Sequence, residues 1–333
     1  MKQPFIELRD IEIGYRGSGG LPKVLLPPIS LQLNEGEFVA IVGPNGTGKS
    51  TLLRTMSALL LPVRGEILFM GKKLQNYSLH ERALMLSIVL TDHPDDLFLK
   101  LEDVVATGRY PYLDFWARLT KNDTEIIEQS IQLCGIDHLK GRTLVSLSDG
   151  ERQKVMIAKA LAQDTPLIIL DEPAAFLDYP SKIELMQLLH RLVNTRNKTV
   201  LFSSHDLDLV LRSADKMWMI SHGKPLVEGV PEQLVLDGTL NEYLDKDDLH
   251  FDAALGQFKM TSVIGKLVHV EGHSLHAKWL KNALLRKGFQ LSEEIRAEFI
   301  ITFAEDVFTV EHNQSKLKYK SIETLLYDIQ KIK

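Results

Sequence analysis

The segment GPNGTGKS, Gly43 to Ser50, has the residue types and the spacing of a phosphate-binding loop. Its glycines let the main chain curl around an anion without Cβ clashes, and backbone N–H groups at the start of the following helix attract phosphate oxygens. We expect Lys49 to reach the outer phosphates of a nucleotide and Ser50 to offer its hydroxyl to Mg²⁺. The alternative is a glycine-rich turn that matches by chance. A buried strand before the loop and an amphipathic helix after it favour nucleotide binding.

An acidic pair stands at the end of LIILDE, Leu167 to Glu172, well downstream of this loop. Asp171 can hold Mg²⁺ through water, and Glu172 is placed to orient or deprotonate an attacking water. Alone, the pair could be a solvated turn, but together with the phosphate loop it indicates catalysis. SSHD places His205 at the end of the next strand, where a neutral imidazole can hydrogen-bond a γ-phosphate. A structural histidine is the alternative there.

The elements that must position these side chains follow from the hydrophobic periodicity. Short strands are expected in residues 5–70, with a glycine- and proline-rich loop among them. Helical spacing dominates residues 120–163, and the apolar runs PLIILDEP and TVLFSSHD are typical of buried parallel strands. Strands that alternate with helices predict an α/β fold. We expect a P-loop nucleotide-binding domain with a mainly parallel sheet, an antiparallel side layer and a helical subdomain at about residues 91–160.

A second unit is expected after the charged segment LDKDDLHFDAA, where the pattern is interrupted. The sequence from there predicts a strand, a helix, a strand, a hairpin and a last helix, which together make a small C-terminal α+β domain. We place the nucleotide-binding domain at residues 4–245 and the accessory domain at residues 255–333. His269, His273 and His276 are either a metal sensor or ordinary surface histidines. A regulatory or dimer-stabilising role is the more general expectation for this domain.

Composition restricts the classes of function. The 333 residues are 44% hydrophobic and 25% charged, which suits a chain with a sizeable core. A net charge of −5 argues against a nucleic-acid binder. The single cysteine, Cys134, excludes an internal disulfide and fits a reducing compartment. No apolar stretch reaches the length of a membrane span and no signal-peptide core is visible, so we expect a cytosolic chain that reaches the membrane through a partner.

Five motifs carry a family resemblance, in the order GPNGTGKST, the signature LSDGERQ, LIILDEP, the D-loop FLD and SSHD. Over roughly residues 4–240 the chain resembles the ATP-binding subunit of an ATP-binding-cassette (ABC) transporter. The resemblance implies an ATPase that uses ATP and Mg²⁺ and works as a homodimer, with each ATP between one subunit's phosphate loop and the other's signature. Ser148 and Gly150 of the signature would then meet the γ-phosphate bound by the opposite subunit. Asp178 of the D-loop would communicate between the two sites.

The resemblance also implies a full set of site residues. Tyr15 lies where the family places the aromatic residue that stacks on adenine, although a tyrosine in an edge strand is the alternative. The implied nucleotide contacts are Tyr15, Gly43, Asn45, Gly46, Gly48, Lys49, Ser50, Thr51, Ser148, Gly150 and Asp178. The implied catalytic residues are Glu172 and His205, and the implied metal ligands are Ser50 and Asp171. Asp92 is a further candidate metal ligand on the chemistry of its carboxylate.

Two residues depart from the family's pattern. Asp149 stands inside the signature, where the family usually has glycine. Because a carboxylate that points at the γ-phosphate would repel it, we expect this side chain to turn away or to serve the helix N-terminus. Asp92, in TDHP, occupies the place of the Q-loop glutamine and could bind Mg²⁺ more strongly than an amide. A solvent-facing loop acid is equally expected at this position, and the coupling role of the position is in doubt.

The segment VVATGRYPYLDFWARLTKND, residues 104–123, resembles the corresponding stretch of ATPases that serve iron–siderophore, haem and cobalamin importers. Its GRYPY run, Gly108 to Tyr112, is either a docking site for a partner's short helix or a local turn with packed aromatics. We therefore expect the ATP-hydrolysing subunit of an iron-chelate importer, peripheral on the cytoplasmic face of the inner membrane. Its partners would be permease subunits and, indirectly, a solute-binding protein, but no nucleic acid. The alternatives are a soluble ABC ATPase without a transport role, a weakly hydrolysing regulator and an exporter.

Overall fold

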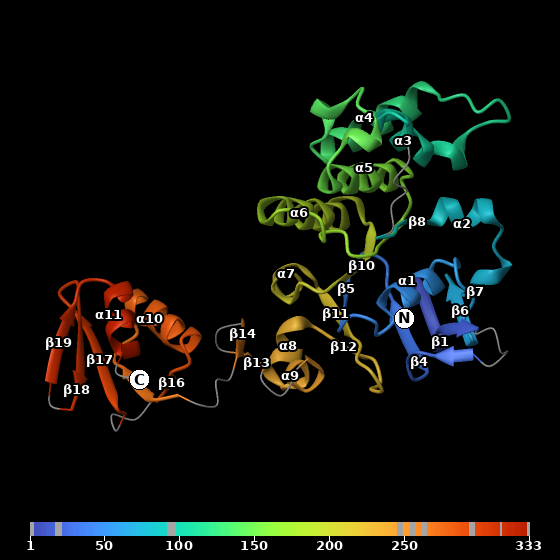
Figure 1. Cartoon of the computed structure of the whole chain (residues 1–333). Coiled ribbons are helices and arrows are strands. Elements are labelled where there is room, and N and C mark those ends of the chain that lie inside the picture. Colours follow the sequence, from blue (N-terminus) through green and yellow to red (C-terminus); the bar gives the residue numbers. More distant parts are fainter. Residues whose placement is uncertain are drawn as a thin grey trace. The chain divides into compact units, whose positions relative to one another are not determined.

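The computed structural model divides the chain into two compact units, Met1–Leu244 and Asp245–Lys333, whose elements are shown in Figure 1. Each unit has a hydrophobic core of its own. The structure describes residues 3–16, 22–91, 98–244, 249–253, 257–260, 265–292, 297–313 and 315–331.

A six-stranded sheet forms the centre of the first unit. Its order is β12 (Val227–Gly229), β11 (Lys216–Met219), β5 (Phe38–Val42), β10 (Thr199–Ser204), β9 (Leu167–Leu170) and β8 (Leu86–Val89). The strands are parallel except for β12, and every residue of β5, β9 and β10 is buried, as the continuous apolar runs predict. Because the register pairs Val42 with Ser204 and Leu170 with Phe202, the loops after β5, β9 and β10 leave one edge of the sheet.

An antiparallel side layer accompanies this sheet. It runs in the order β4 (Ile29–Leu33), β1 (Ile6–Glu12), β6 (Arg64–Phe69) and β7 (Lys72–Lys73), and a two-stranded hairpin consists of β2 (Gly14–Arg16) and β3 (Pro22–Val24). Helix α1 (Lys49–Met56) packs against both sheets, since its Leu52 and Met56 share one apolar cluster with Leu8 of β1 and Ile41 of β5. The predicted α/β fold with a parallel sheet and an antiparallel side layer is confirmed.

Helices α3 (Leu101–Ala106), α4 (Lys121–Leu133) and α5 (Asp149–Ala162) form a helical subdomain with a separate apolar cluster, and Figure 1 shows them side by side. Helix α4 begins with a capping box of Thr120 and Asp123, and α5 with one of Ser148 and Glu151. In each box the two side chains bond backbone N–H groups that have no partner within the helix. The other helical segments of the first unit are η1 (Leu74–Asn76), α2 (Leu79–Met85), η2 (Thr107–Tyr112), η3 (Asp137–Leu139), η4 (Leu144–Ser146), α6 (Tyr179–Arg196), α7 (Leu207–Ser213), α8 (Pro231–Leu236) and α9 (Thr239–Leu244).

Arg109 anchors the GRYPY run in the interior of this subdomain, whereas Tyr110 and Tyr112 are 66% and 41% exposed. Arg109 is 4% exposed and donates from Nε to Asp123 Oδ1 at 2.8 Å and from Nη1 to the Ala162 carbonyl at 2.9 Å. The centre of its guanidinium lies 3.8 Å from the ring centroid of Tyr112. Arg109 thus ties η2 to the start of α4 and the end of α5. These contacts show a local turn in which Tyr112 packs on Arg109, and the docking interpretation of GRYPY stays a prediction.

The second unit is built around a five-stranded sheet. Its order is β16 (Gln290–Leu291), β15 (Leu267–Val270), β17 (Phe299–Ala304), β18 (Val307–His312) and β19 (Ser315–Tyr319). Strands β15 and β17 are parallel and joined through α10 (Leu275–Arg286), whereas β17, β18 and β19 are antiparallel and lead to α11 (Ile322–Lys331). Both helices pack into one core with Val268 and Phe299. A hairpin of β13 (Leu249–Asp252) and β14 (Gln257–Met260) precedes this sheet.

Candidate active site

A cavity of about 580 Å³ lies at the edge of the sheet where β5, β9 and β10 end. It is lined by Tyr15, Leu25, Asn45, Gly46, Gly48, Lys49, Ser50, Thr51, Arg54, Thr91, Asp171, Glu172 and His205. Most of the predicted site residues therefore meet in one place, although they come from four separate parts of the sequence. Ser148, Gly150 and Asp178 do not line this cavity, and Asp92 lies outside the residues that the structure describes.

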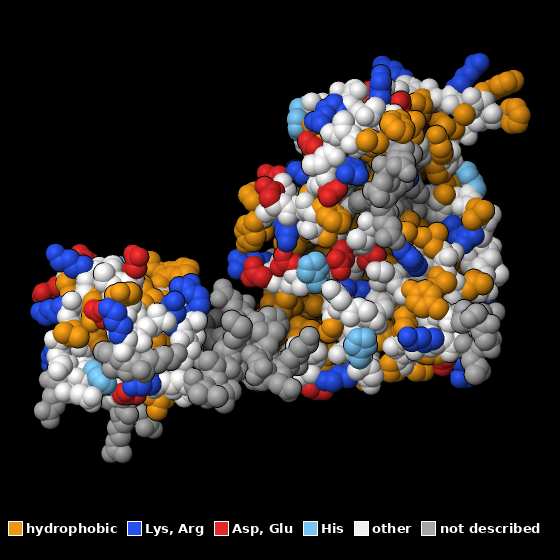
Figure 2. Space-filling view, in the orientation of Figure 1, with side chains coloured by type: hydrophobic (Ala, Val, Ile, Leu, Met, Phe, Trp, Pro, Cys, Tyr) orange, Lys and Arg blue, Asp and Glu red, His pale blue; other side chains and the backbone are white. Residues whose placement is uncertain are grey.

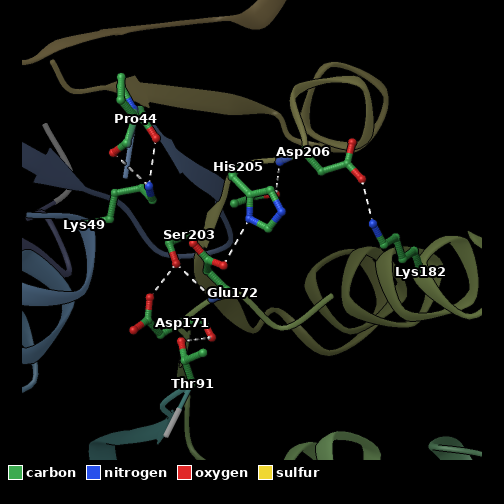
Figure 3. Close-up of polar contacts among 11 residues, drawn as sticks. Pro44, Lys49, Thr91, Asp171, Glu172, Lys182, Ser203, His205 and Asp206 are labelled. Atoms are coloured by element: carbon green, nitrogen blue, oxygen red, sulfur yellow. Dashed lines mark hydrogen bonds and ion pairs between the residues drawn. The ribbon is translucent and has the colours of Figure 1, made fainter. Parts of the chain in front are cut away.

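The phosphate loop connects β5 to α1 and has the backbone that its glycines allow. Gly48 takes φ +104° at the start of α1, and Gly46 takes φ +80°. Lys49 is 5% exposed, and its Nζ donates to the Gly43 carbonyl at 2.7 Å and to the Pro44 carbonyl at 3.2 Å (Figure 3). Burial lowers the pKa of the Lys49 ammonium. The loop therefore places a buried cation and oriented N–H groups where an anion can bind.

The acidic pair follows β9 and is joined to β10 by a single hydroxyl. Ser203 Oγ donates to Asp171 Oδ1 at 2.7 Å and accepts from the Glu172 N–H at 2.9 Å (Figure 3). Asp171 is 1% exposed and Ser203 is fully buried, so both hydrogen bonds lie away from bulk water. The backbone of Glu172 has φ +49°, which is uncommon for a residue with a side chain. The hydroxyl of Ser203 therefore positions both acids at once.

Ser203 is a functional residue that the sequence reasoning missed. The sequence interpretation of SSHD concerned His205 alone. A polar side chain at 203 is nevertheless a detectable signal, because every position of this strand is buried and a buried hydroxyl must find a partner.

His205 contacts the acidic pair directly. Its Nδ1 lies 3.0 Å from Glu172 Oε2, and the imidazole is 55% exposed on the cavity side (Figure 3). The next residue, Asp206, caps α7 and forms an ion pair with Lys182 of α6, with Oδ2 and Nζ 3.0 Å apart. The turn between β10 and α7 is thus held by two contacts, that of His205 with Glu172 and that of Asp206 with Lys182.

Tyr15 lies in β2 at the mouth of the cavity, with 48% of its surface exposed. Its hydroxyl is 2.7 Å from Thr51 Oγ1, which orients the ring over the start of α1. An exposed aromatic ring held beside a phosphate loop can stack on a nucleotide base.

The signature and the D-loop lie beside each other in the same chain. Ser148 caps α5, where its backbone N–H donates to Glu151 Oε2 at 2.8 Å. Gly150 packs closely against the D-loop segment, since a Cβ at this position would lie 2.9 Å from the Phe176 carbonyl oxygen. Asp178 caps α6 by accepting the Ser181 N–H at 3.1 Å. None of the three residues lines the chain's own cavity.

The Asp149 side chain lies in solvent and interacts within its own helix. Its carboxylate is 67% exposed and forms an ion pair with Arg152 one turn later, with Oδ1 and Nη2 2.9 Å apart. It stands in the first turn of α5, where a negative charge is favourable to the helix.

Comparison with known proteins decides the family. The family described as ABC transporter matches residues 26–175. An uncharacterized ABC transporter ATP-binding protein of Methanocaldococcus jannaschii is 38% identical over 255 residues, which are 77% of this chain and 86% of that relative. The chain belongs to the ABC transporter ATP-binding proteins. The ABC resemblance seen in the sequence is confirmed, and with it the ATPase class.

Other ABC ATP-binding proteins and solved ABC cassettes are also similar to this chain. The ferric enterobactin transport ATP-binding protein of Escherichia coli is 35% identical over 207 residues, 62% of this chain and 76% of the relative. A petrobactin import ATP-binding protein of Bacillus subtilis is 34% identical over 240 residues, 72% and 92% of the two chains. A dimeric structure of a bacterial ABC transporter cassette has a TM-score of 0.60 at 25% identity, covering 68% of this chain and 98% of that one. The same cassette was solved in a post-hydrolysis state bound to ADP and Pi.

The family of the second unit is a finding that the sequence reasoning did not make. The family described as iron ABC transporter C-terminal domain matches residues 265–330 of this ABC ATPase. Two of the three histidines considered as a metal sensor have local contacts: His269 Nδ1 lies 2.9 Å from the Ser292 carbonyl oxygen, and the His276 ring stacks on Phe303 with centroids 4.1 Å apart. No group of three metal-ligating side chains occurs among the described residues. Nor does any described helix combine the length and apolar character that a membrane span needs.

Proposed function

We propose that this ABC ATPase hydrolyses ATP to drive the import of an iron chelate through a membrane permease. The observation that carries the proposal is the single cavity in which the phosphate loop, the acidic pair and His205 meet. The iron cargo is supported by the match of residues 265–330 to an iron ABC transporter C-terminal domain and by the ferric enterobactin and petrobactin relatives. Haem and cobalamin are related chelates within the same proposal. The relatives are transport and import subunits, which disfavours a non-transport ATPase.

The nucleotide would be held by the loop and by Tyr15. Lys49 and the loop N–H groups bind the outer phosphates, because they combine a buried cation with oriented donors. Ser50 and Asp171 both line the cavity, and a hydroxyl and a carboxylate are the hard oxygen ligands that suit Mg²⁺. Such an ion would neutralise charge on the phosphate oxygens when bound.

Glu172 is the general base in this proposal. Its backbone is fixed by Ser203 and its carboxylate by His205, so the oxygen that accepts a proton from the attacking water is held in place. His205 also presents an exposed ring nitrogen to the cavity, where it can hydrogen-bond the γ-phosphate.

A second copy of the chain completes each site. Ser148, Gly150 and Asp178 lie outside the cavity of their own chain, so ATP bound by one copy would be closed by the signature of the other. This arrangement predicts a nucleotide-sandwich homodimer beneath two permease subunits, peripheral on the cytoplasmic face of the membrane, with a solute-binding protein as an indirect partner.

The test is the substitution Glu172→Gln. Removing the base while retaining nucleotide binding should give dimers that persist in ATP with little turnover, measured by light scattering during size-exclusion chromatography. Lys49→Ala is the matched control and should lose the ATP-dependent dimer. In cells that depend on this importer, uptake of radiolabelled ferric chelate should fall to background with Glu172→Gln. A variant that stays monomeric at saturating ATP would refute the sandwich, and unchanged iron uptake would refute the cargo.

A further inference from the structure

The segment Leu113–Thr120, here called the aromatic tip, carries two large side chains into solvent. Phe115 is 93% exposed and Trp116 is 71% exposed. Their rings meet edge to face with centroids 5.5 Å apart. Figure 1 shows the chain between α3 and α4 extending as a loop beyond the helices, and Figure 2 shows hydrophobic side chains at the end of this loop beside a basic one.

The aromatic tip is a turn stabilised by its own hydrogen bonds. Asp114 Oδ1 accepts the N–H groups of Trp116 at 3.0 Å and Arg118 at 3.2 Å, and its carbonyl accepts the Ala117 N–H at 3.0 Å. The carboxylate of Asp114 therefore caps the turn, and the turn holds both aromatic rings outward. Such hydrogen bonding restricts the loop to one shape in which a large apolar surface faces water.

The residues on either side of the aromatic tip are also held by hydrogen bonds and an ion pair. Arg109, before the tip, and Asp123, after it, form a buried ion pair in which each side chain is 5% exposed. Thr120 shares a capping box with Asp123 at the start of α4. Both ends of the segment are thus tied to one point of the helical subdomain, so the exposure of the rings is a consequence of the fold.

The charges around the rings are basic. Residues 110–122 contain one acid, Asp114, and its carboxylate bonds the turn's own backbone. The same stretch contains Arg118 and Lys121; the Lys121 side chain is 93% exposed, and its Nζ lies 3.8 Å from Glu125 Oε1 in a weak exposed pair. The tip is therefore locally positive in a chain whose net charge is −5. Exposed aromatics flanked by basic side chains are typical of the boundary between a bilayer and water.

The size of the apolar surface also favours lipid. Two aromatic side chains can bury about 300–500 Å², whereas a specific protein interface takes about 800 Å² from each partner. We propose that the aromatic tip inserts Phe115 and Trp116 into the headgroup region of an anionic bilayer, with Arg118 and Lys121 on the lipid phosphates. This contact goes beyond the proposed function, because it needs neither ATP hydrolysis nor the permease.

The experiment uses the full chain with vesicles of phosphatidylcholine alone and of phosphatidylcholine mixed with phosphatidylglycerol. Trp279→Phe serves as the background, because Trp218 is fully buried and Trp279 is 59% exposed on the second unit. Trp116 should then shift its emission to the blue with anionic vesicles only. The double substitution Phe115→Ser and Trp116→Ser should weaken cosedimentation with anionic vesicles by at least about tenfold. Removing the charged side chain of Arg118 or of Lys121 should weaken it about fivefold in each case.

Each result decides the proposal. The Phe115→Ser and Trp116→Ser variant should retain the melting temperature and the ATPase rate of the unaltered chain, because neither side chain is buried or near the cavity. The Trp279→Phe background should bind vesicles as the unaltered chain does, which excludes a general effect of removing an exposed aromatic. The proposal is overturned if the chain does not bind vesicles, or if the Phe115→Ser and Trp116→Ser variant binds them as tightly as the unaltered chain. Burial of the tip only in the presence of the permease overturns it in favour of a protein contact.

Discussion

Replacing Ser203 by alanine tests the idea that one buried hydroxyl positions both acids. The change removes a hydrogen bond of 2.7 Å to the Asp171 carboxylate and leaves the Glu172 N–H without its bond of 2.9 Å. A hydrogen bond to a charged group contributes about 1.5–3 kcal/mol, and an unsatisfied buried donor costs about 1–3 kcal/mol. Because both bonds share the same oxygen, we expect the free energy of unfolding to fall by about 2–4 kcal/mol.

The effect of Ser203→Ala on catalysis should be larger than its effect on ATP binding. Loss of a group that orients ligands and a base typically lowers activity about 10–100-fold. We expect kcat to fall by that factor and the Mg²⁺ concentration for half-maximal activity to rise. The KM for ATP should change by less than about threefold, because Lys49 and the phosphate loop are untouched. Steady-state ATPase assays across Mg²⁺ concentrations and urea unfolding measure these quantities.

Ser87→Ala is the matched control. Ser87 is 1% exposed in β8 and its hydroxyl lies 3.0 Å from Thr165 Oγ1, but it contacts neither acid. Because it loses one hydrogen bond between neutral groups, it should lower stability by only about 0.5–1.5 kcal/mol and leave kcat unchanged. If Ser203→Ala loses stability as the control does while its kcat stays within about twofold, a value inside ordinary context effects, then Ser203 only supports the fold and the positioning argument is wrong.

Two other substitutions test charges in the helical subdomain. Hydrogen bonds from Thr120, together with Arg109, hold the pKa of Asp123 below its usual range, so the carboxylate stabilises the fold above the unfolded pKa and this is lost as pH falls through the folded pKa. Asp123→Asn should therefore cost about 3–5 kcal/mol at neutral pH, and urea unfolding should show the two proteins converging in acid. Asp149→Gly should alter the ATPase rate by no more than about fivefold, because its exposed ion pair with Arg152 is weak. A many-fold rise would instead reveal Asp149 as an electrostatic brake.

The sequence predicted the parts of the site that depend on one segment at a time. The phosphate loop between a buried strand and a helix, and the acids after LIIL, follow from local spacing and apolar runs. The role of Ser203 depends on the register between β10 and β9, which pairs Phe202 with Leu170. Periodicity within one strand does not specify its register against another.

The same limit explains why the sequence left two interpretations of GRYPY. Spacing showed that the segment is aromatic and interrupted by proline, but not that Arg109 would find Asp123, 14 residues later, inside the subdomain. The sequence therefore did not decide between docking and packing. The elements of the second unit followed from its alternating pattern, whereas its family could not be inferred without a recognisable motif.

Gly150 has a consequence for how the two halves of a dimer depend on each other. A Cβ on this glycine would approach the Phe176 carbonyl oxygen of its own D-loop to 2.9 Å, and in the proposed dimer the other side of the glycine would face the second copy's nucleotide. Lys154 of the same helix donates to Ser181 Oγ at 3.2 Å, at the start of α6. The signature helix and the D-loop are thus in direct contact. A larger residue at position 150 would therefore displace the D-loop, which follows the chain's own acidic pair. One substitution would then impair both ATP sites from a single position.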